Sequence, residues 1–194
     1  MKGEYVLNDG IIIGSIIWLV IRALILFRNE KYKSISIKRE IIFNAFVVYC
    51  IAVVIVILPD FRMIGRGMTS IHPSISFIPF VDIINGFQHS HFSFAFKLKL
   101  LLRNLLGNLV LLLPLGVFLP MLWKKFRYFK KTILVGVSVS LTIELMQLLL
   151  SFLGLSGRIA DIDDLILNTI GALIGYFIYS KIFVRFNLFS QFEQ

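Results

Sequence analysis

Long apolar runs separated by short polar segments dominate this sequence. Five runs are candidate membrane spans: Ile11 to Phe27, Ile41 to Leu58, Leu100 to Trp123, Thr132 to Leu153 and Leu165 to Phe183. An α-helix crosses the ~30 Å of bilayer hydrocarbon with about 20 apolar residues. The pattern therefore predicts an all-α fold, a polytopic integral membrane helix bundle with about five transmembrane helices.

The segment between the second and third runs, from Pro59 to Lys99, has a different pattern. Repeated glycines and prolines break its apolar sequence too often for a further span. Within it a group of apolar residues follows helical spacing: Phe80, Ile83, Ile84 and Phe87. This spacing predicts a short interfacial or re-entrant helix near residues 75–90. The sequence shows no internal repeat, so we expect a single membrane domain over residues 1–194.

Composition agrees with a membrane protein and narrows the set of partners. The chain is 58% hydrophobic and only 16% charged, whereas charged residues make up about 25% of soluble domains. Its net charge is +9, but the basic residues lie in short loops between apolar runs, which indicates membrane topology and no nucleic-acid partner. Cys50 is the only cysteine, so the chain has no internal disulfide.

The distribution of basic residues predicts the orientation of the chain. Two loops are strongly basic: Arg28, Lys31, Lys33, Lys38 and Arg39 follow the first run, and Lys124, Lys125, Arg127, Lys130 and Lys131 follow the third. Basic residues beside spans stay in the cytoplasm. We therefore expect the N-terminus outside and the C-terminus inside. Arg22 lies near the inner end of the first span, where its long side chain is expected to reach the cytoplasmic headgroups.

Polar residues inside the last three runs form stripes at helical spacing. The stripes are Asn104 and Asn108, then Ser140, Glu144, Gln147 and Ser151, then Asp161, Asp164 and Asn168. In the predicted orientation they lie in the outer half of the membrane. Because exposing such groups to lipid is costly, we expect the stripes to face each other and line a cleft open to the outer surface. The competing interpretation is that these residues only hold the helices together.

Small residues and prolines mark two further features of the same runs. Gly171 and Gly175 form a small-xxx-small pair, which would let a neighbouring helix approach the fifth span closely. Pro114, Gly116 and Pro120 are expected to interrupt the third span and to release backbone carbonyls that need other partners, or only to kink the span for packing.

Several segments together resemble the pattern of VanZ-like membrane proteins. They are SLTIELMQ at residues 140–147, Gly157-Arg158, DIDDLILN at 161–168 with Gly171, NLVLLLPLGVFLP at 108–120 and Ile78-Pro79-Phe80. The resemblance covers about residues 75–180, with residues 1–58 as two additional N-terminal spans. Ala160 departs from the pattern, because an aromatic residue or a serine is expected before Asp161.

The resemblance implies a multi-pass protein of the bacterial plasma membrane with a role in low-level glycopeptide resistance, to teicoplanin more than to vancomycin. It implies no known enzyme mechanism and no cofactor. The residues that match its polar positions are Asn108, Glu144, Gln147, Arg158, Asp161, Asp164 and Asn168. They are the candidate binding residues of the outward cleft, and no catalytic residue follows from the resemblance.

Three functions are compatible with these residues. The first is a non-enzymatic protein whose cleft binds a lipid-linked cell-wall precursor or a lipoglycopeptide. The second is an enzyme at the outer leaflet, in which Asp161, Asp164 and Asn168 hold Mg²⁺ against a lipid diphosphate and Glu144 is the general acid or base. The third is a transporter of a small solute or lipid. The sequence leaves the oligomeric state open.

His72, Asp82, His89 and His91 lie on an external loop without the spacing of a metal site. We expect solvated histidines there and no bound metal.

Overall fold

A computed structural model of the chain describes residues 2–28, 36–58, 75–76, 93–155 and 160–184. Within these ranges, five helices are long and apolar enough to cross a membrane, as predicted. They are α1 (Lys2–Arg28), α2 (Ile37–Ile57), α4 (Phe94–Leu122), α5 (Phe129–Phe152) and α6 (Ile162–Ile178), which continues as the π-helix η4 (Tyr179–Val184). A 3-10 turn, η3 (Lys124–Arg127), joins α4 to α5.

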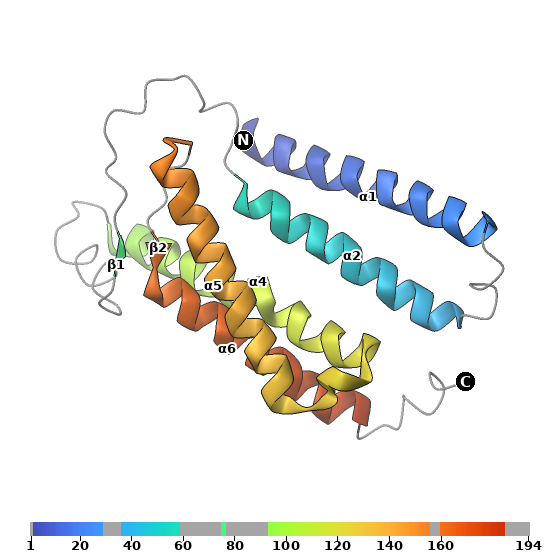
Figure 1. Cartoon of the computed structure of the whole chain (residues 1–194). Helices are drawn as coiled ribbons and strands as arrows, with labels where there is room; N and C mark the ends of the chain where they lie inside the picture. Colours follow the sequence, from blue (N-terminus) through green and yellow to red (C-terminus); the bar gives the residue numbers. More distant parts are fainter. Residues whose placement is uncertain (1, 29–35, 59–74, 77–92, 156–159, 185–194) are drawn as a thin grey trace.

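Two short strands complete the described part of the fold. β1 (Ile75–Ser76) pairs in parallel with β2 (Ala160–Asp161), and Ile75 is opposite Ala160 in the register. The start of the segment predicted as an interfacial helix near residues 75–90 is therefore extended. Its remainder, including Phe80 and Phe87, lies outside the described residues. The strand pair is next to the start of α6 (Figure 1).

The core of the bundle lies between α4, α5 and α6. Five buried apolar residues form it: Leu112, Leu115, Leu119, Ile143 and Ala172. α4 makes its most extensive contact with α6, whereas α1 packs chiefly on α2 at the side of the bundle (Figure 1). No residue of α2 is buried, and many large apolar side chains of α1 are exposed. Lipid contact accounts for such apolar surfaces in a membrane protein.

Glycine allows the backbones of α4 and α6 to touch. A Cβ atom added at Gly171 or Gly175 would lie 2.0 Å from the carbonyl oxygen of Leu109 or Leu113, respectively. On the other helix, a Cβ at Gly116 would lie 2.1 Å from the carbonyl oxygen of Ala172. Contacts this short do not occur, so only glycine fits. The predicted close approach at Gly171 and Gly175 is confirmed, and α4 is the helix that approaches.

The prolines of the third span do not divide it. α4 continues through Pro114 and Pro120 to Leu122, so the expected interruption is wrong. The prolines lie where neighbouring helices cover the backbone, because Pro120 is buried and the Tyr49 hydroxyl of α2 donates a hydrogen bond of 2.8 Å to the carbonyl of Leu111. In a membrane, partners of this kind make a proline within a helix tolerable.

A polar network joins α1 to α2. The Arg22 guanidinium donates to both carboxylate oxygens of Glu40, at 2.5 and 2.8 Å. Asn44 donates to a Glu40 oxygen at 3.1 Å and accepts a bond of 2.8 Å from the Trp18 indole N–H. Arg22 and Glu40 thus form an ion pair in which their side chains are 12% and 17% exposed, and the reach of Arg22 to the headgroups stays a prediction.

Candidate functional site

Three helices bring polar side chains together beside the strand pair. The Asn108 amide of α4 donates a short hydrogen bond to an Asp164 carboxylate oxygen in the first turn of α6. The Ser140 hydroxyl of α5 donates to the carbonyl of Leu165 at 3.3 Å. Glu144 of α5 accepts a bond of 3.1 Å from the backbone N–H of Asp161. We call this group of side chains between α4, α5 and α6 the polar site.

The stripe on α5 faces the protein interior, as its spacing predicts. Ser140, Glu144, Gln147 and Ser151 are all buried, although exposed apolar residues such as Leu141 and Leu145 lie between them. Glu144 is only 6% exposed. A polar stripe turned inward on a helix with an apolar outer face is the arrangement expected for a protein in lipid.

The stripe on α6 differs from the prediction at its first residue. Asp161 is not helical: it lies in β2 with φ −123° and ψ 129°, and its carboxylate accepts a bond of 2.9 Å from the backbone N–H of Asp163. It therefore acts as the N-cap of α6, a position that aspartate favours because its oxygen satisfies an unpaired helix N–H. Only Asp164 and Asn168 continue as a helical stripe.

Asn168 is among the most deeply buried members of the polar site. It is 1% exposed, and its amide oxygen has no hydrogen-bond partner among the described residues. The hydroxyl of Ser151 on α5 is also buried without a hydrogen-bond partner among the described residues. An unsatisfied acceptor in an apolar surrounding costs about 1–3 kcal/mol, so each of these two oxygens would be stabilised by a hydrogen-bond donor.

The depth of Asn108 differs from the estimate made from the sequence. Because α4 begins at Phe94, before the predicted Leu100, Asn108 lies about four turns into the helix and not two. Its hydrogen bond to Asp164 nevertheless makes it level with the first turn of α6. The burial changes over the site from Asn168, which is buried, to Asn108 and Asp164, which are half-buried.

Two further residues complete the comparison with the predicted site. Arg158 lies outside the described residues. Asp163 was not singled out by the sequence pattern, yet it is buried at the start of α6, next to Asp164. The signal that points to it is the acidic first turn of α6, because carboxylates stabilise the positive end of a helix dipole.

The chemistry available at the site is hydrogen bonding and acid–base chemistry. The described residues contain no group of three or more histidine, cysteine, aspartate or glutamate side chains arranged to hold a metal ion. Asp161 and Asp164 use carboxylate oxygens to cap α6 and to bind Asn108. Catalysis with Mg²⁺ at these residues remains a prediction.

Comparison with family models identifies the family of the chain. A family model described as VanZ/LLP1 matches residues 46–185, which is well over half of the chain. The match starts within α2 and includes all of α4, α5 and α6, so the whole polar site lies inside it. No curated protein and no solved structure matches the chain.

Proposed function

The chain belongs to the VanZ/LLP1 family, and on this premise we propose that it protects the cell envelope against glycopeptide antibiotics. VanZ-like proteins are associated with antibiotic resistance. The proposed effect is low-level resistance in the bacterial plasma membrane, stronger against teicoplanin than against vancomycin. Its proposed cause is the binding of a lipid-linked envelope component, such as a cell-wall precursor or a lipoglycopeptide, in a cleft that opens outward at the polar site.

The observation that favours binding is the pair of buried acceptors without partners. If the polar residues only held the helices together, each buried polar atom would be expected to have a partner within the bundle. Asn168 and Ser151 instead keep oxygens without hydrogen bonds among the described residues. Amide N–H and sugar O–H groups of a lipid-linked precursor are donors that would satisfy them, which is why a ligand of this class is proposed.

The other groups of the site extend the same proposal. The Asp164 carboxylate accepts from the Asn108 amide and the Glu144 carboxylate accepts from a backbone N–H, so both suit ligands rich in donors. Gln147 is buried on the same face of α5 and can both donate and accept. To Arg158 we assign charge-assisted bonds to a phosphate or carboxylate of the ligand.

The first test measures teicoplanin susceptibility of a sensitive Gram-positive host that expresses the chain. We expect expression of the unaltered chain to lower susceptibility. The variant Glu144→Gln keeps the shape of the side chain, and we expect it to abolish the effect at normal membrane abundance. Unchanged teicoplanin sensitivity at verified expression of the unaltered chain would contradict the proposal.

Two serines on α5 provide a test of whether the polar residues bind a ligand or only pack the helices. Ser140 is buried and donates to α6, whereas Ser138 is exposed and donates to Leu134 of its own helix at 2.8 Å. We expect Ser140→Ala to weaken resistance and Ser138→Ala to leave it intact, with equal abundance of both variants. If resistance only follows abundance across these variants, the polar residues serve packing and the binding proposal fails.

The outward orientation of the cleft has its own test. With Cys50 replaced by serine, the chain has no other cysteine, so Asp164→Cys introduces a single thiol. We expect an impermeant thiol reagent added outside intact cells to label it. Labelling only from the cytosolic side would reverse the proposed topology.

A further inference from the structure

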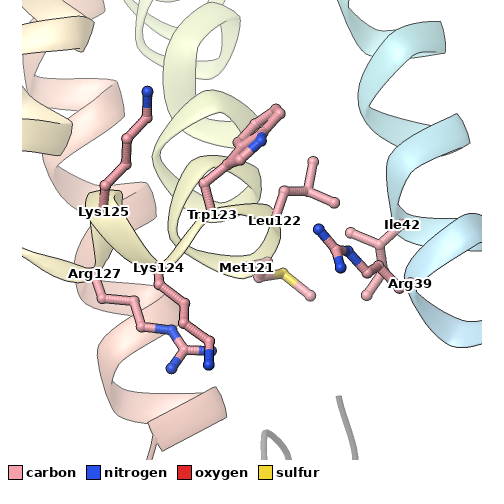
Figure 2. Close-up of a pocket in the computed structure, with 8 residues that line it drawn as sticks. All are labelled: Arg39, Ile42, Met121, Leu122, Trp123, Lys124, Lys125 and Arg127. Carbon is pink, nitrogen blue, oxygen red and sulfur yellow. The ribbon is translucent and has the colours of Figure 1, made fainter. Parts of the chain in front are cut away.

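A second polar feature lies at the other end of α4, away from the polar site. A pocket of about 310 Å³ lies between the first turns of α2 and the η3 turn. Figure 2 shows the side chains that line it, which include Arg39, Ile42, Met121, Trp123, Lys124 and Arg127. We name it the basic pocket. Its lining within the described residues contains several cations and no aspartate or glutamate.

The cations of the basic pocket come from distant parts of the sequence. Arg39 belongs to the start of α2, and Lys124 and Arg127 belong to η3. In Figure 2 Arg39 reaches from α2 toward Met121, and Lys124 and Arg127 extend from η3. The rule that keeps basic residues in cytoplasmic loops requires no convergence of this kind. An anion bound between α2 and η3 would be attracted by the charges of both elements.

The acid that follows Arg39 in the sequence binds a residue of another helix. Glu40 follows Arg39 directly in the sequence, but both of its oxygens bind Arg22 of α1. It is therefore held on the α1 side of α2 by a bidentate pair, an arrangement with fixed geometry. The charge of Arg39 remains available to a ligand in the basic pocket.

The wall of the pocket is held in place by the bundle. The Thr132 hydroxyl of α5 donates a short hydrogen bond to the carbonyl of Phe126, and the Tyr176 hydroxyl of α6 donates a hydrogen bond of 2.7 Å to the carbonyl of Arg127. The Trp123 ring packs edge-on against Phe46 of α2, with 5.4 Å between ring centroids. A turn fixed from three helices loses little freedom when it binds a ligand.

The surroundings of the basic pocket indicate which anion it takes. The pocket lies where two candidate spans end, and Ile42, Met121 and the buried Leu122 give it an apolar side. Tryptophan at a span end marks the level of lipid headgroups. The predicted orientation makes this the cytoplasmic side, where the leaflet is rich in anionic lipid and basic pockets between helices bind lipid headgroups.

We propose that the basic pocket binds the phosphate of an anionic phospholipid, with Arg39, Lys124 and Arg127 around the phosphate and the acyl chains along Ile42 and Met121. Guanidinium groups bind phosphate through paired, charge-assisted bonds, and lysine adds a point charge. The proposal is independent of the antibiotic function, because it concerns the opposite end of α4.

The test uses the purified full chain in detergent with equimolar phosphatidylglycerol and phosphatidylcholine, and measures retained lipid by native mass spectrometry. We expect the unaltered chain to retain phosphatidylglycerol in preference. The double variant Arg39→Gln/Lys124→Gln should lower this retention by about tenfold or more, since each lost charge-assisted bond weakens binding severalfold. The control Lys38→Gln/Lys130→Gln removes two charges close in sequence to Arg39 and Lys124, at residues of α2 and α5 that do not line the pocket. It should change retention less than twofold.

Two results would overturn the proposal. Equal retention of the two lipids by the unaltered chain, or an equal loss in the control variant, would show that the basic residues act only through total charge. A further arm adds inorganic phosphate at millimolar concentration. Phosphatidylglycerol that persists supports a lipid site, whereas its displacement assigns the pocket to free phosphate and removes the lipid.

Discussion

The contact of α4 with α6 predicts a sharp contrast between glycine positions. An alanine at Gly171 would place its Cβ 2.0 Å from the carbonyl oxygen of Leu109. Carbon and oxygen approach to about 3.3 Å in close helix contacts, so the helices would have to separate by roughly 1.3 Å. The obstructing atom belongs to the backbone and cannot rotate away. We expect a destabilisation at or above the upper part of the ~1–3 kcal/mol range for overpacked cores.

Gly107 provides the matched control on the partner helix. It is exposed on α4, and an added Cβ would have no neighbour within 4 Å. Alanine there should stabilise the helix by about 0.5–1 kcal/mol, because glycine is unfavourable in a helix interior. The two substitutions add the same methyl group, so their difference of roughly 4 kcal/mol reports only on the helix contact.

The assay is unfolding of the purified protein by a gradient of denaturing detergent, followed by far-UV circular dichroism. Gly171→Ala should unfold well before the unaltered protein, and Gly107→Ala at the same point or later. Equal midpoints for the two variants would refute the reasoning, because they would mean that α4 and α6 do not touch at Gly171.

Three further predictions concern hydrogen bonds of named residues. Arg22→Met leaves the Glu40 carboxylate without its cation and should lower the stability by up to ~3 kcal/mol in the same unfolding assay. The double variant Arg22→Met/Glu40→Met should recover most of this loss. A double variant without such recovery would contradict the ion pair as the cause. Asn168→Leu should change the stability by no more than about 1 kcal/mol, because the amide oxygen it removes has no partner among the described residues. The same variant should abolish teicoplanin resistance. A stable variant with full resistance would exclude Asn168 from binding. Tyr176→Phe removes the bond to the Arg127 carbonyl and should cost about 1 kcal/mol, whereas Tyr128→Phe, on an exposed ring, should cost nothing measurable; equal effects in thermal unfolding would argue against that bond.

The spans could be predicted from hydropathy, but their beginnings could not. α4 starts at Phe94, before the predicted Leu100, because Lys97 and Lys99 make this stretch look polar although lysine is a good helix former. The Ser93 side chain, which accepts from the N–H of Phe96 at 3.4 Å, was a readable start signal. α6 likewise begins earlier than predicted, after the Asp161 cap. Capping residues were the better guide to these helix ends.

The buried face of the α5 stripe could be predicted, whereas Asn104 of the α4 stripe is exposed, and the partners of the polar residues could not be predicted. Helical spacing fixes which residues share a face, and Glu144 with Gln147 is indeed buried on one face of α5. That Glu144 binds the N–H of Asp161, and Asn108 the carboxylate of Asp164, depends on how far each helix slides along its neighbour. Sequence spacing along one helix contains no information about that displacement.

The displacement is set by the glycines of α4 and α6. Gly171 and Gly175 lie on α6 between Asp164, which binds Asn108, and Tyr176, which binds the carbonyl of Arg127. Backbones that touch at two places on one helix cannot slide without a clash, so the same contact aligns the polar site at one end and holds the η3 turn of the basic pocket at the other. A lipid environment offers polar groups no water as an alternative partner. A fixed alignment is therefore what allows buried carboxylates and amides to meet their partners, whereas the Asn168 amide oxygen has no partner among the described residues.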